Sequence, residues 1–211
     1  MARISQALER WQTAAASVSL VAVRCGGALM FVSAFMVGFD VIARKTLHWS
    51  LGGSDELSGY AFAIATSWSL AFTLLQRANV RIDALYSHLP RPVAAVIDLV
   101  ALLALGFFVG LLMWFAATVL GDSLHFHTRA NTPLAVAQWM PQSLWLIGYA
   151  IFIFAWLPLT LRCVVALGQG NTAAVNAMAG ARTLNEDAGE EVASAHDRAE
   201  GAFGLEAGRP S

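Results

Sequence analysis

Four long apolar runs dominate the pattern of this chain, at about 18–42, 57–75, 93–120 and 144–167. Each run is long enough to cross the hydrocarbon core of a bilayer as a helix, which takes about 20 predominantly apolar residues. A strand of a membrane β-barrel would instead alternate apolar and polar side chains, whereas these runs are continuous. The pattern therefore predicts an all-α integral membrane protein with four transmembrane helices.

The segment ahead of the first run, residues 1–17, has a weaker amphipathic pattern. Apolar side chains recur there at helical spacing, at Ile4, Leu8, Trp11 and Ala15. This spacing fits either a short helix lying on the cytoplasmic membrane interface or the start of a long first helix. A cleaved signal peptide is disfavoured, because the apolar run is too long and Arg24 interrupts it.

The C-terminal segment, residues 169–211, differs in composition from the membrane domain that we place at 18–168. Of the 14 acidic residues in the chain, seven fall within the last 26 positions. Few large apolar side chains accompany them, so the segment cannot bury enough surface to fold alone. We therefore expect a flexible, disordered acidic tail.

Composition excludes several classes of protein. Charged residues make up 13% of the chain and hydrophobic residues 57%, against about 25% and 45–50% in soluble domains. The 13 basic residues are spread over 211 positions and make no basic surface for nucleic acid. The two cysteines form no C-x-x-C pair, which argues against a disulfide scaffold and against thiol redox chemistry.

The distribution of basic residues predicts the orientation in the membrane. On one side lie ten, namely Arg3, Arg10, Arg24, Arg77, Arg81, Arg91, Arg162, Arg182, Arg198 and Arg209. On the other side lie three, namely Arg44, Lys45 and Arg129. Because Lys and Arg are retained on the cytoplasmic side of short loops, both termini are expected in the cytoplasm.

The charges in the first two runs have structural interpretations. Asp40 and Arg44 stand four residues apart with the acid first, a spacing that favours an ion pair within one helix. Glu56 opens the second run, where the helix dipole favours a carboxylate, and Ser54 is a candidate N-cap. Arg24 lies toward the cytoplasmic end of its run, and we expect it to contact lipid phosphates.

Membrane-interface anchors are expected at the ends of the runs. Arg162 lies near the end of the fourth run and is assigned to lipid phosphates in the same way as Arg24. Four tryptophans fall near predicted boundaries, as interfacial aromatic side chains do, namely Trp11, Trp49, Trp139 and Trp145. Three others fall within runs and could face lipid, the bundle or a partner helix, namely Trp68, Trp114 and Trp156.

Groups that could carry chemistry are sparse in the sequence. The second run has a polar series, which we assign to interhelical hydrogen bonds rather than to a substrate site, at Thr66, Ser67, Ser69 and Thr73. Glycines at four positions suit close helix packing, namely Gly26, Gly27, Gly106 and Gly110.

His125 and His127 could chelate a metal with Asp122, but an exposed polar loop is the preferred interpretation. The five histidines lie in loops, at edges or in the tail, which argues against haem. We predict no enzyme activity, no cofactor and no metal.

Three short motifs in order resemble the small permease subunit of tripartite ATP-independent periplasmic (TRAP) transporters, the DctQ-type family. They are D-V-I-A-R at 40–44, E-L-S-G-Y at 56–60 and R-A-N-V-R-I-D-A-L-Y at 77–86, followed by Leu89-Pro90. The family's motif residues would then be Asp40, Arg44, Glu56, Arg77, Arg81 and Asp83. One departure is that Asn79-Val80 stands where the family commonly has His, so hydrogen bonding can persist there but titration cannot.

The resemblance implies a non-catalytic subunit of the bacterial inner membrane. Its partner would be a large multi-span permease that carries sodium and substrate sites, with an organic acid delivered by a periplasmic binding protein and with membrane lipids around the subunit. Arg77, Arg81 and Asp83 would hold their loop to neighbouring helices or lipid phosphates, or would only enforce topology. The alternatives are a membrane-anchor subunit of a respiratory oxidoreductase and a small self-sufficient transporter whose second helix lines a pore.

Overall fold

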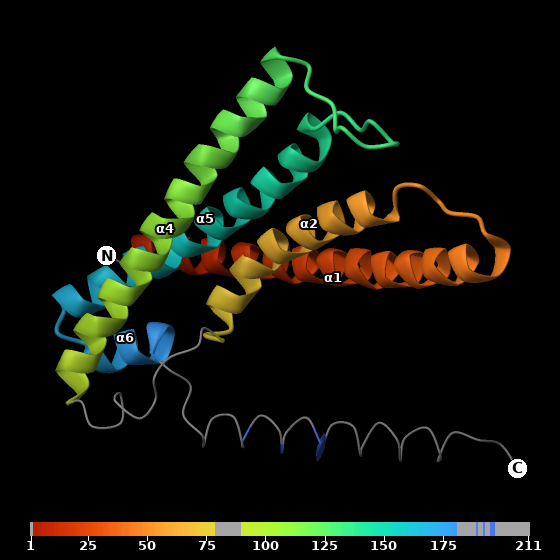
Figure 1. Ribbon diagram of the computed structural model, residues 1–211. Helices are drawn as coiled ribbons and strands as arrows, with labels where there is room; N and C mark the ends of the chain where they lie inside the picture. Colours follow the sequence, from red (N-terminus) through yellow and green to blue (C-terminus); the bar gives the residue numbers. More distant parts are fainter. Residues whose placement is uncertain (1, 79–89, 181–188, 190–191, 193–194, 197–211) are drawn as a thin grey trace, which may run out of the picture. The chain divides into compact units, whose positions relative to one another are not determined.

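The computed structural model describes residues 2–78, 90–180, 189, 192 and 195–196. The chain divides into two units, Met1–Gly180 and Ala181–Ser211, and the helices discussed here belong to the first. They are α1 (Ala2–Leu47), α2 (Ser54–Leu75), α4 (Arg91–His125), α5 (Trp139–Gly168) and α6 (Thr172–Ala179), shown in Figure 1. Within the described ranges, α1, α2, α4 and α5 are long and apolar enough to cross a membrane. This result confirms the predicted all-α membrane fold.

The first helix is longer than a membrane span requires. Its 46 residues run from Ala2 to Leu47 without a break, a length of about 69 Å at 1.5 Å per residue, against a hydrocarbon core of about 30 Å. Residues 2–17 therefore continue α1 and do not form a separate interfacial helix. Of the two possibilities that the sequence left open, the structure has the long first helix.

The central element of the bundle is α5. It packs against α1, α2, α4 and α6, whereas α1 and α2 pair as a hairpin and α4 packs against α5 and α6 (Figure 1). The side chains of Phe152, Ala155, Leu159 and Cys163 on α5 are buried in the hydrophobic core. The core therefore follows α5 along the bundle.

Small residues bring the helices close together at particular positions. A Cβ added to Gly26 of α1 would lie 3.1 Å from Ala65 Cα of α2, and one added to Gly106 of α4 would overlap the Trp156 indole of α5. The expectation of close packing therefore holds at these two glycines. Gly27 and Gly110 make no such contact within this chain, since a Cβ there would meet no atom within 4 Å.

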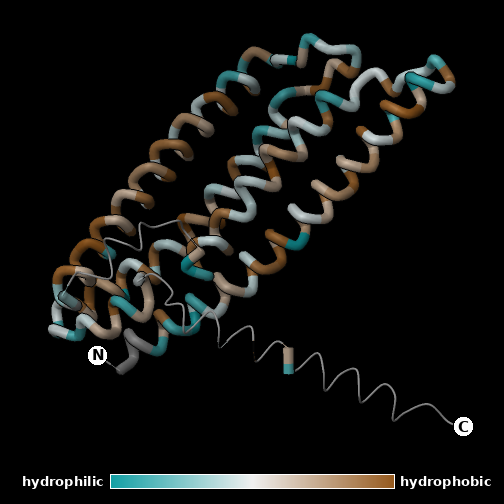
Figure 2. Tube along the Cα trace, turned by 60° about the horizontal axis from the view of Figure 1, so that its bottom comes forward, coloured by the Kyte–Doolittle hydropathy of each residue, from teal (hydrophilic) through white to brown (hydrophobic). Residues whose placement is uncertain are grey.

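The outward faces of the long helices are apolar. Figure 2 shows hydrophobic colours along the middle of the helices and hydrophilic ones gathered near their ends and connections. Large exposed side chains on α1 and α4 include Phe31, Phe35, Phe107, Trp114 and Phe115. Because lipid tails solvate apolar groups, such faces suit a bilayer or a partner helix rather than water.

The helix α6 corrects the predicted start of the tail. Its N-cap is Asn171, whose side chain accepts a hydrogen bond from the Ala174 N–H at 3.1 Å. The side chains of Val175 and Ala179 are buried, and α6 packs against α4 and α5. A helix this short is not stable alone but can form on neighbouring helices, so the packed unit ends at Gly180 rather than at Gly168. The remainder of the predicted acidic tail lies outside the described residues, apart from four positions.

Candidate functional site

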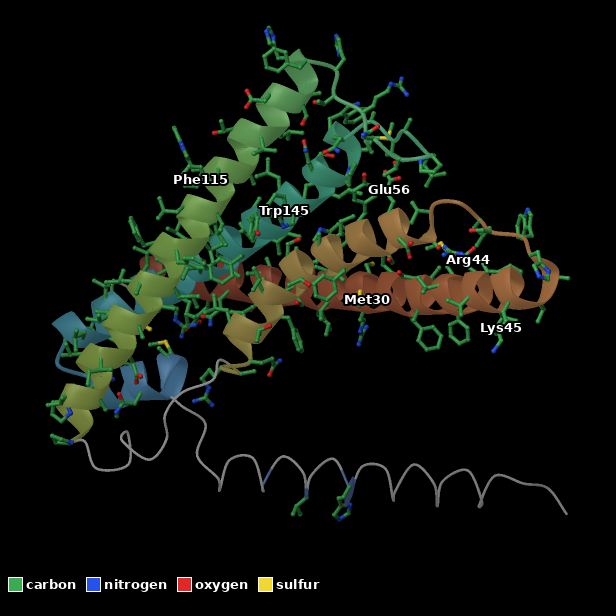
Figure 3. The ribbon with its side chains drawn as sticks, in the orientation of Figure 1. Met30, Arg44, Lys45, Glu56, Phe115 and Trp145 are labelled. Atoms are coloured by element: carbon green, nitrogen blue, oxygen red, sulfur yellow. The ribbon has the colours of Figure 1, made fainter. Side chains whose placement is uncertain are left out.

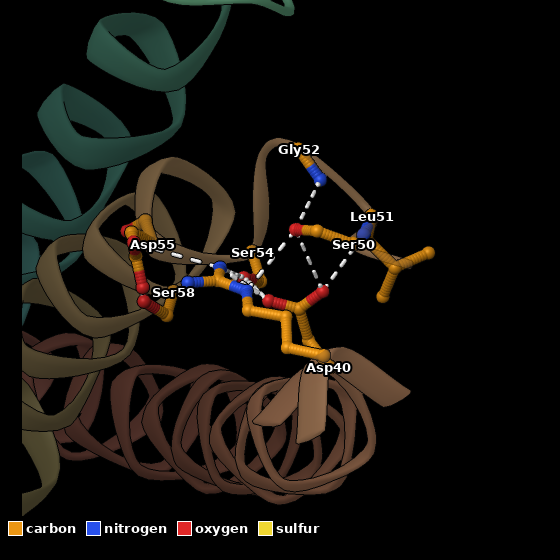
Figure 4. A network of polar contacts seen from close by, with 8 residues as sticks. Asp40, Ser50, Leu51, Gly52, Ser54, Asp55 and Ser58 are labelled. Carbon is orange, nitrogen blue, oxygen red and sulfur yellow. Dashed lines mark hydrogen bonds and ion pairs between the residues drawn. The ribbon is translucent and has the colours of Figure 1, made fainter. Parts of the chain in front are cut away.

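A buried carboxylate organises the connection between α1 and α2. The Asp40 side chain is only 1% exposed. Its Oδ1 atom accepts hydrogen bonds from the Leu51 backbone N–H at 2.7 Å and from the Ser50 hydroxyl at 3.2 Å. Its Oδ2 atom accepts one from the Ser54 hydroxyl at 2.7 Å and forms an ion pair with Arg44 (Figure 4). The carboxylate thus has several partners, as a buried acid requires.

The guanidinium of Arg44 extends the same network, which we call the Asp40 clamp (Asp40, Arg44, Ser50, Leu51, Ser54). Arg44 Nε donates to the Ser50 hydroxyl at 3.1 Å and Nη2 to the Ser54 hydroxyl at 3.3 Å. The Asp55 carboxylate lies 4.0 Å from Nη2 and is largely exposed. The ion pair between Asp40 and Arg44 that the spacing predicts is therefore present, within a larger network.

The Asp40 clamp fixes a tight reversal of the chain. Gly52 has a φ of +70°, a conformation that glycine adopts without steric cost, and its N–H donates to the Ser50 hydroxyl at 3.1 Å. The donors that surround Asp40 come from the end of α1, the connection and the start of α2. The arrangement therefore holds three consecutive segments together, and its chemistry is that of a structural anion site.

The start of α2 corrects the assignment of Ser54 as N-cap. The N-cap is Gly53, without a side-chain capping bond, and the Ser54 hydroxyl donates to Asp40. A buried carboxylate forms stronger, charge-assisted hydrogen bonds than a backbone group does. The capping pattern missed this partner because Asp40 lies 14 residues earlier in the chain.

Glu56 joins the start of α2 to the connection between α4 and α5. One carboxylate oxygen accepts the Tyr60 hydroxyl at 2.7 Å, and the other accepts the Thr132 hydroxyl. Figure 3 shows Glu56 near the start of α2, beside this connection. Leu134 packs so closely on Gly53 that a Cβ there would overlap it. Glu56 therefore lies in the first helical turn, as expected, and also links the two helical hairpins.

Arg162 lies at the opposite end of the bundle from the Asp40 clamp and has partners within the protein that the sequence did not indicate. Its guanidinium donates to the Gln12 side chain and lies 4.0 Å from the Glu9 carboxylate. The Trp11 ring lies 5.6 Å from the Phe154 ring, measured between centroids. Arg162 and Trp11 thus join α5 to the N-terminal part of α1 and are not directed only at lipid. Arg24 is exposed on α1, and its contact with lipid phosphate stays a prediction.

The other tryptophans divide between the bundle and its surface. The indole N–H groups of Trp68 and Trp156 donate to backbone carbonyls of neighbouring helices, at Leu144 and Leu102, each at 2.8 Å. Trp114 is 71% exposed. The indoles of Trp68 and Trp156 therefore act as links between helices, which the sequence left undecided.

Two predicted interfacial anchors begin α5. Trp139 is its first residue and is 40% exposed. The Trp145 ring lies 5.2 Å from the Tyr149 ring between centroids, and the side chain packs partly against the core. The role of both as membrane anchors stays a prediction.

The polar series on α2 does not make the interhelical bonds that we expected. Its hydroxyls donate to carbonyls three or four residues earlier in the same helix, from Thr66 to Phe62, Ser67 to Ile64, Ser69 to Thr66 and Thr73 to Ser69. Ser and Thr commonly bond to the preceding turn in this way, since that carbonyl is always within reach. The hydroxyls of this series are therefore already hydrogen-bonded within α2, which argues against the series as the polar lining of a transport pore.

The remaining candidates are only partly covered by the structure. Arg77 follows α2 with a φ of +55°, and its N–H donates to the Leu74 carbonyl at 3.1 Å. Arg81 and Asp83 lie outside the described residues, as does Asn79-Val80. Over the described part of the chain, His, Cys, Asp and Glu side chains form no group of three or more that could hold a metal.

The chain matches the model of a known family. The model of the family described as tripartite ATP-independent periplasmic transporters, DctQ component, matches residues 33–166, which is more than half of the chain. The matched region includes the Asp40 clamp, Glu56 and nearly all of α5. No curated protein and no solved structure matches the chain.

Proposed function

This chain belongs to the DctQ family of tripartite ATP-independent periplasmic transporters, and we propose that it serves there as the non-catalytic brace of a large permease subunit. Family membership and four helices able to span a membrane make it a small permease subunit and a multi-pass protein of the bacterial inner membrane. The proposal adds which subunit carries out which part of transport. The large multi-span subunit holds the sodium and substrate sites, and a periplasmic binding protein delivers an organic acid.

The observation that carries this proposal is how the polar groups of the bundle are used. Asp40 and Glu56 each bind groups from more than one segment at one end of the bundle. Trp68 and Trp156 use their N–H groups to join neighbouring helices. Transport sites usually need polar groups that are open to a pathway near the membrane midplane. The polar groups of these four residues instead form hydrogen bonds that join segments of the bundle.

We further propose that both termini are cytoplasmic, which places the Asp40 clamp on the periplasmic side. The count of ten basic residues against three supports this orientation. The connections that precede α2 and α5 then face the periplasm. Their fixed shape, held by Asp40 and Glu56, suits a surface beside the entry point of a binding protein.

The test is reconstitution of the subunits in defined combinations. Proteoliposomes receive the small subunit alone, the large permease alone or both, and uptake of a radiolabelled organic acid is measured with its binding protein under a sodium gradient. We expect uptake only where the large permease is present, with full uptake requiring both. Uptake by the small subunit alone would refute the proposal, as would failure of the two subunits to co-purify.

The competing role as a membrane anchor of a respiratory oxidoreductase has a separate readout. It requires haem absorption or quinone-dependent activity in the purified complex. The family match is to a transporter component, so we expect neither signal.

A further inference from the structure

Two hollows lie along one face of α1. The first, of about 350 Å³, is apolar and is lined by Ser17, Val18, Val21, Ala22, Trp68 and Ile151. The second, of about 400 Å³, is lined by four polar or charged residues, Gln6, Glu9, Arg10 and Thr13, and is called the polar hollow below. Residues three or four apart share a face of a helix, and the series 6, 10, 13, 17 and 21 has this spacing. The hollows therefore follow one another along the same face.

The packing of α1 on α2 gives the depth of these hollows in the membrane. A Cβ added to Gly26 would lie 3.1 Å from Ala65 Cα, and the two helices run antiparallel because they form a hairpin. Leu75, the last residue of α2, comes ten residues after Ala65 and so lies about level with position 16 of α1. The 22 residues of α2 span about 33 Å at 1.5 Å per residue, close to the thickness of the hydrocarbon core, so we take the level of Leu75 as the edge of the hydrocarbon layer. On this basis the apolar hollow lies just inside that layer, and Arg10 lies about 9 Å beyond the level of Leu75.

That position places the Arg10 backbone at the outer edge of the headgroup layer, with the lipid phosphates within reach of its side chain. The polar layer on each face of a bilayer is about 5–8 Å thick, and long basic side chains extend along the membrane normal to reach it. Arg162, at the same end of the bundle, is paired with Glu9 and bound to Gln12. Arg10 is exposed, and no described acidic side chain pairs with it. It therefore presents a positive charge that is available to an anion.

We propose that these two hollows together bind one anionic phospholipid of the bilayer. Its phosphate pairs with the Arg10 guanidinium beside the Gln6 amide, and part of one acyl chain fills the apolar hollow among α1, α2 and α5. The order of the two hollows matches the order of the parts of a lipid along the membrane normal. Charge complementarity favours the phosphate because the Glu9 carboxylate, which also lines the polar hollow, is directed at Arg162 at 4.0 Å, which leaves the Arg10 charge for the lipid.

The experiment measures lipid retained by the full-length purified protein. Dioleoyl phosphatidylglycerol is titrated into the detergent-solubilised chain, and bound lipid is counted by native mass spectrometry. Arg10→Gln removes the charge, and Val21→Trp fills the apolar hollow from a side chain that is 60% exposed, so the core is untouched. Matched controls are Lys45→Gln, an exposed base at the other end of α1, and Val32→Trp, which is 64% exposed and lines neither hollow.

We expect Arg10→Gln to weaken retention about fivefold, the usual effect of one basic residue at an anionic surface. Val21→Trp should weaken it as well, whereas Arg10→Lys and both controls should retain the wild-type amount. Dioleoylglycerol, which has the same chains without the phosphate, should bind no better to wild type than to Arg10→Gln. Circular dichroism and gel filtration verify that each variant is folded.

Three outcomes would overturn the inference. Equal retention by all variants would mean that only loosely associated surrounding lipid is present. Equal binding of dioleoylglycerol and dioleoyl phosphatidylglycerol would remove the phosphate contact. If Val21→Trp leaves lipid retention unchanged but abolishes co-purification with the large permease, a helix of the partner occupies the hollow instead. None of these results depends on whether the small subunit transports anything.

Discussion

The contact between Gly148 of α5 and Ser67 of α2 gives the sharpest test of how the bundle is held together. A Cβ added to Gly148 would lie 2.6 Å from Ser67 Cβ and 2.7 Å from the Ser67 carbonyl carbon. Ordinary van der Waals contact begins near 3.4 Å. Gly148→Ala therefore requires the two helices to separate by about 0.7 Å, because the backbone of Ser67 cannot rotate away.

Two opposing effects determine whether Gly148→Ala raises or lowers the free energy of unfolding. Overpacking a well-packed interface costs about 1–3 kcal/mol, and a gap of 0.5–1 Å also forfeits about a quarter to a half of the dispersion energy of the atoms that part. Alanine in place of glycine stabilises a helix interior by about 1 kcal/mol. Because the overlap involves backbone that cannot move aside, we take the upper value of about 3 kcal/mol for overpacking. Subtracting about 1 kcal/mol of helix propensity leaves an expected net loss of about 2 kcal/mol.

The control is Gly110→Ala on α4, where a new Cβ would meet no atom within 4 Å. Only the gain in helix propensity acts there, so this variant should be more stable than wild type. In thermal unfolding of the detergent-solubilised protein, about 2 kcal/mol corresponds to a fall of roughly 4–8 °C for a chain of this size. If Gly148→Ala and Gly110→Ala shift the melting temperature in the same direction, the inferred contact between α2 and α5 is wrong.

Two further predictions concern the Asp40 end of the bundle. Asp40→Ala removes the acceptor of the Leu51 N–H, so hydrogen exchange at that amide should accelerate roughly tenfold or more, while Asp55→Ala, with its exposed carboxylate, should leave it unchanged. Equal exchange in both variants would contradict the Asp40 clamp. For orientation, a single cysteine at Asn131 in a variant without the native cysteines should react with an impermeant maleimide from the periplasm, and one at Gln169 only after permeabilisation. The reverse pattern would overturn the proposed topology.

Predictions from sequence succeeded where the physical cause is local. The apolar runs give the membrane helices because helix length and bilayer thickness are tied together. The Asp40–Arg44 pair follows from a four-residue spacing on one helix. The start of the tail was misplaced because α6 is stabilised by α4 and α5, a contribution that local composition does not show.

The polar links between segments could not be predicted for a related reason. Thr132 lies 76 residues from Glu56, and Gln12 lies 150 residues from Arg162. For Arg162 the sequence indicated a lipid phosphate, because position at a helix end does not reveal a protein acceptor brought close by packing. Only the packing of α1 along α5 decides the matter, because it brings an acid and an amide into reach.

The long first helix explains why the two ends of the bundle differ in their use of charge. At the Asp40 end, α1 stops and the chain reverses, so buried donors and acceptors must be satisfied locally, and a carboxylate with several partners does so. At the other end α1 continues past the last residue of α2 and lies against α5, where Glu9 and Gln12 engage Arg162. That extension leaves Arg10 on the outer face, one to two turns beyond the level at which α2 ends. A first helix shortened to the minimum membrane span would lose both the contact with Arg162 and the headgroup-level charge. The extra length of α1 therefore joins the N-terminal segment to the bundle through Arg162 and positions Arg10 for the proposed lipid.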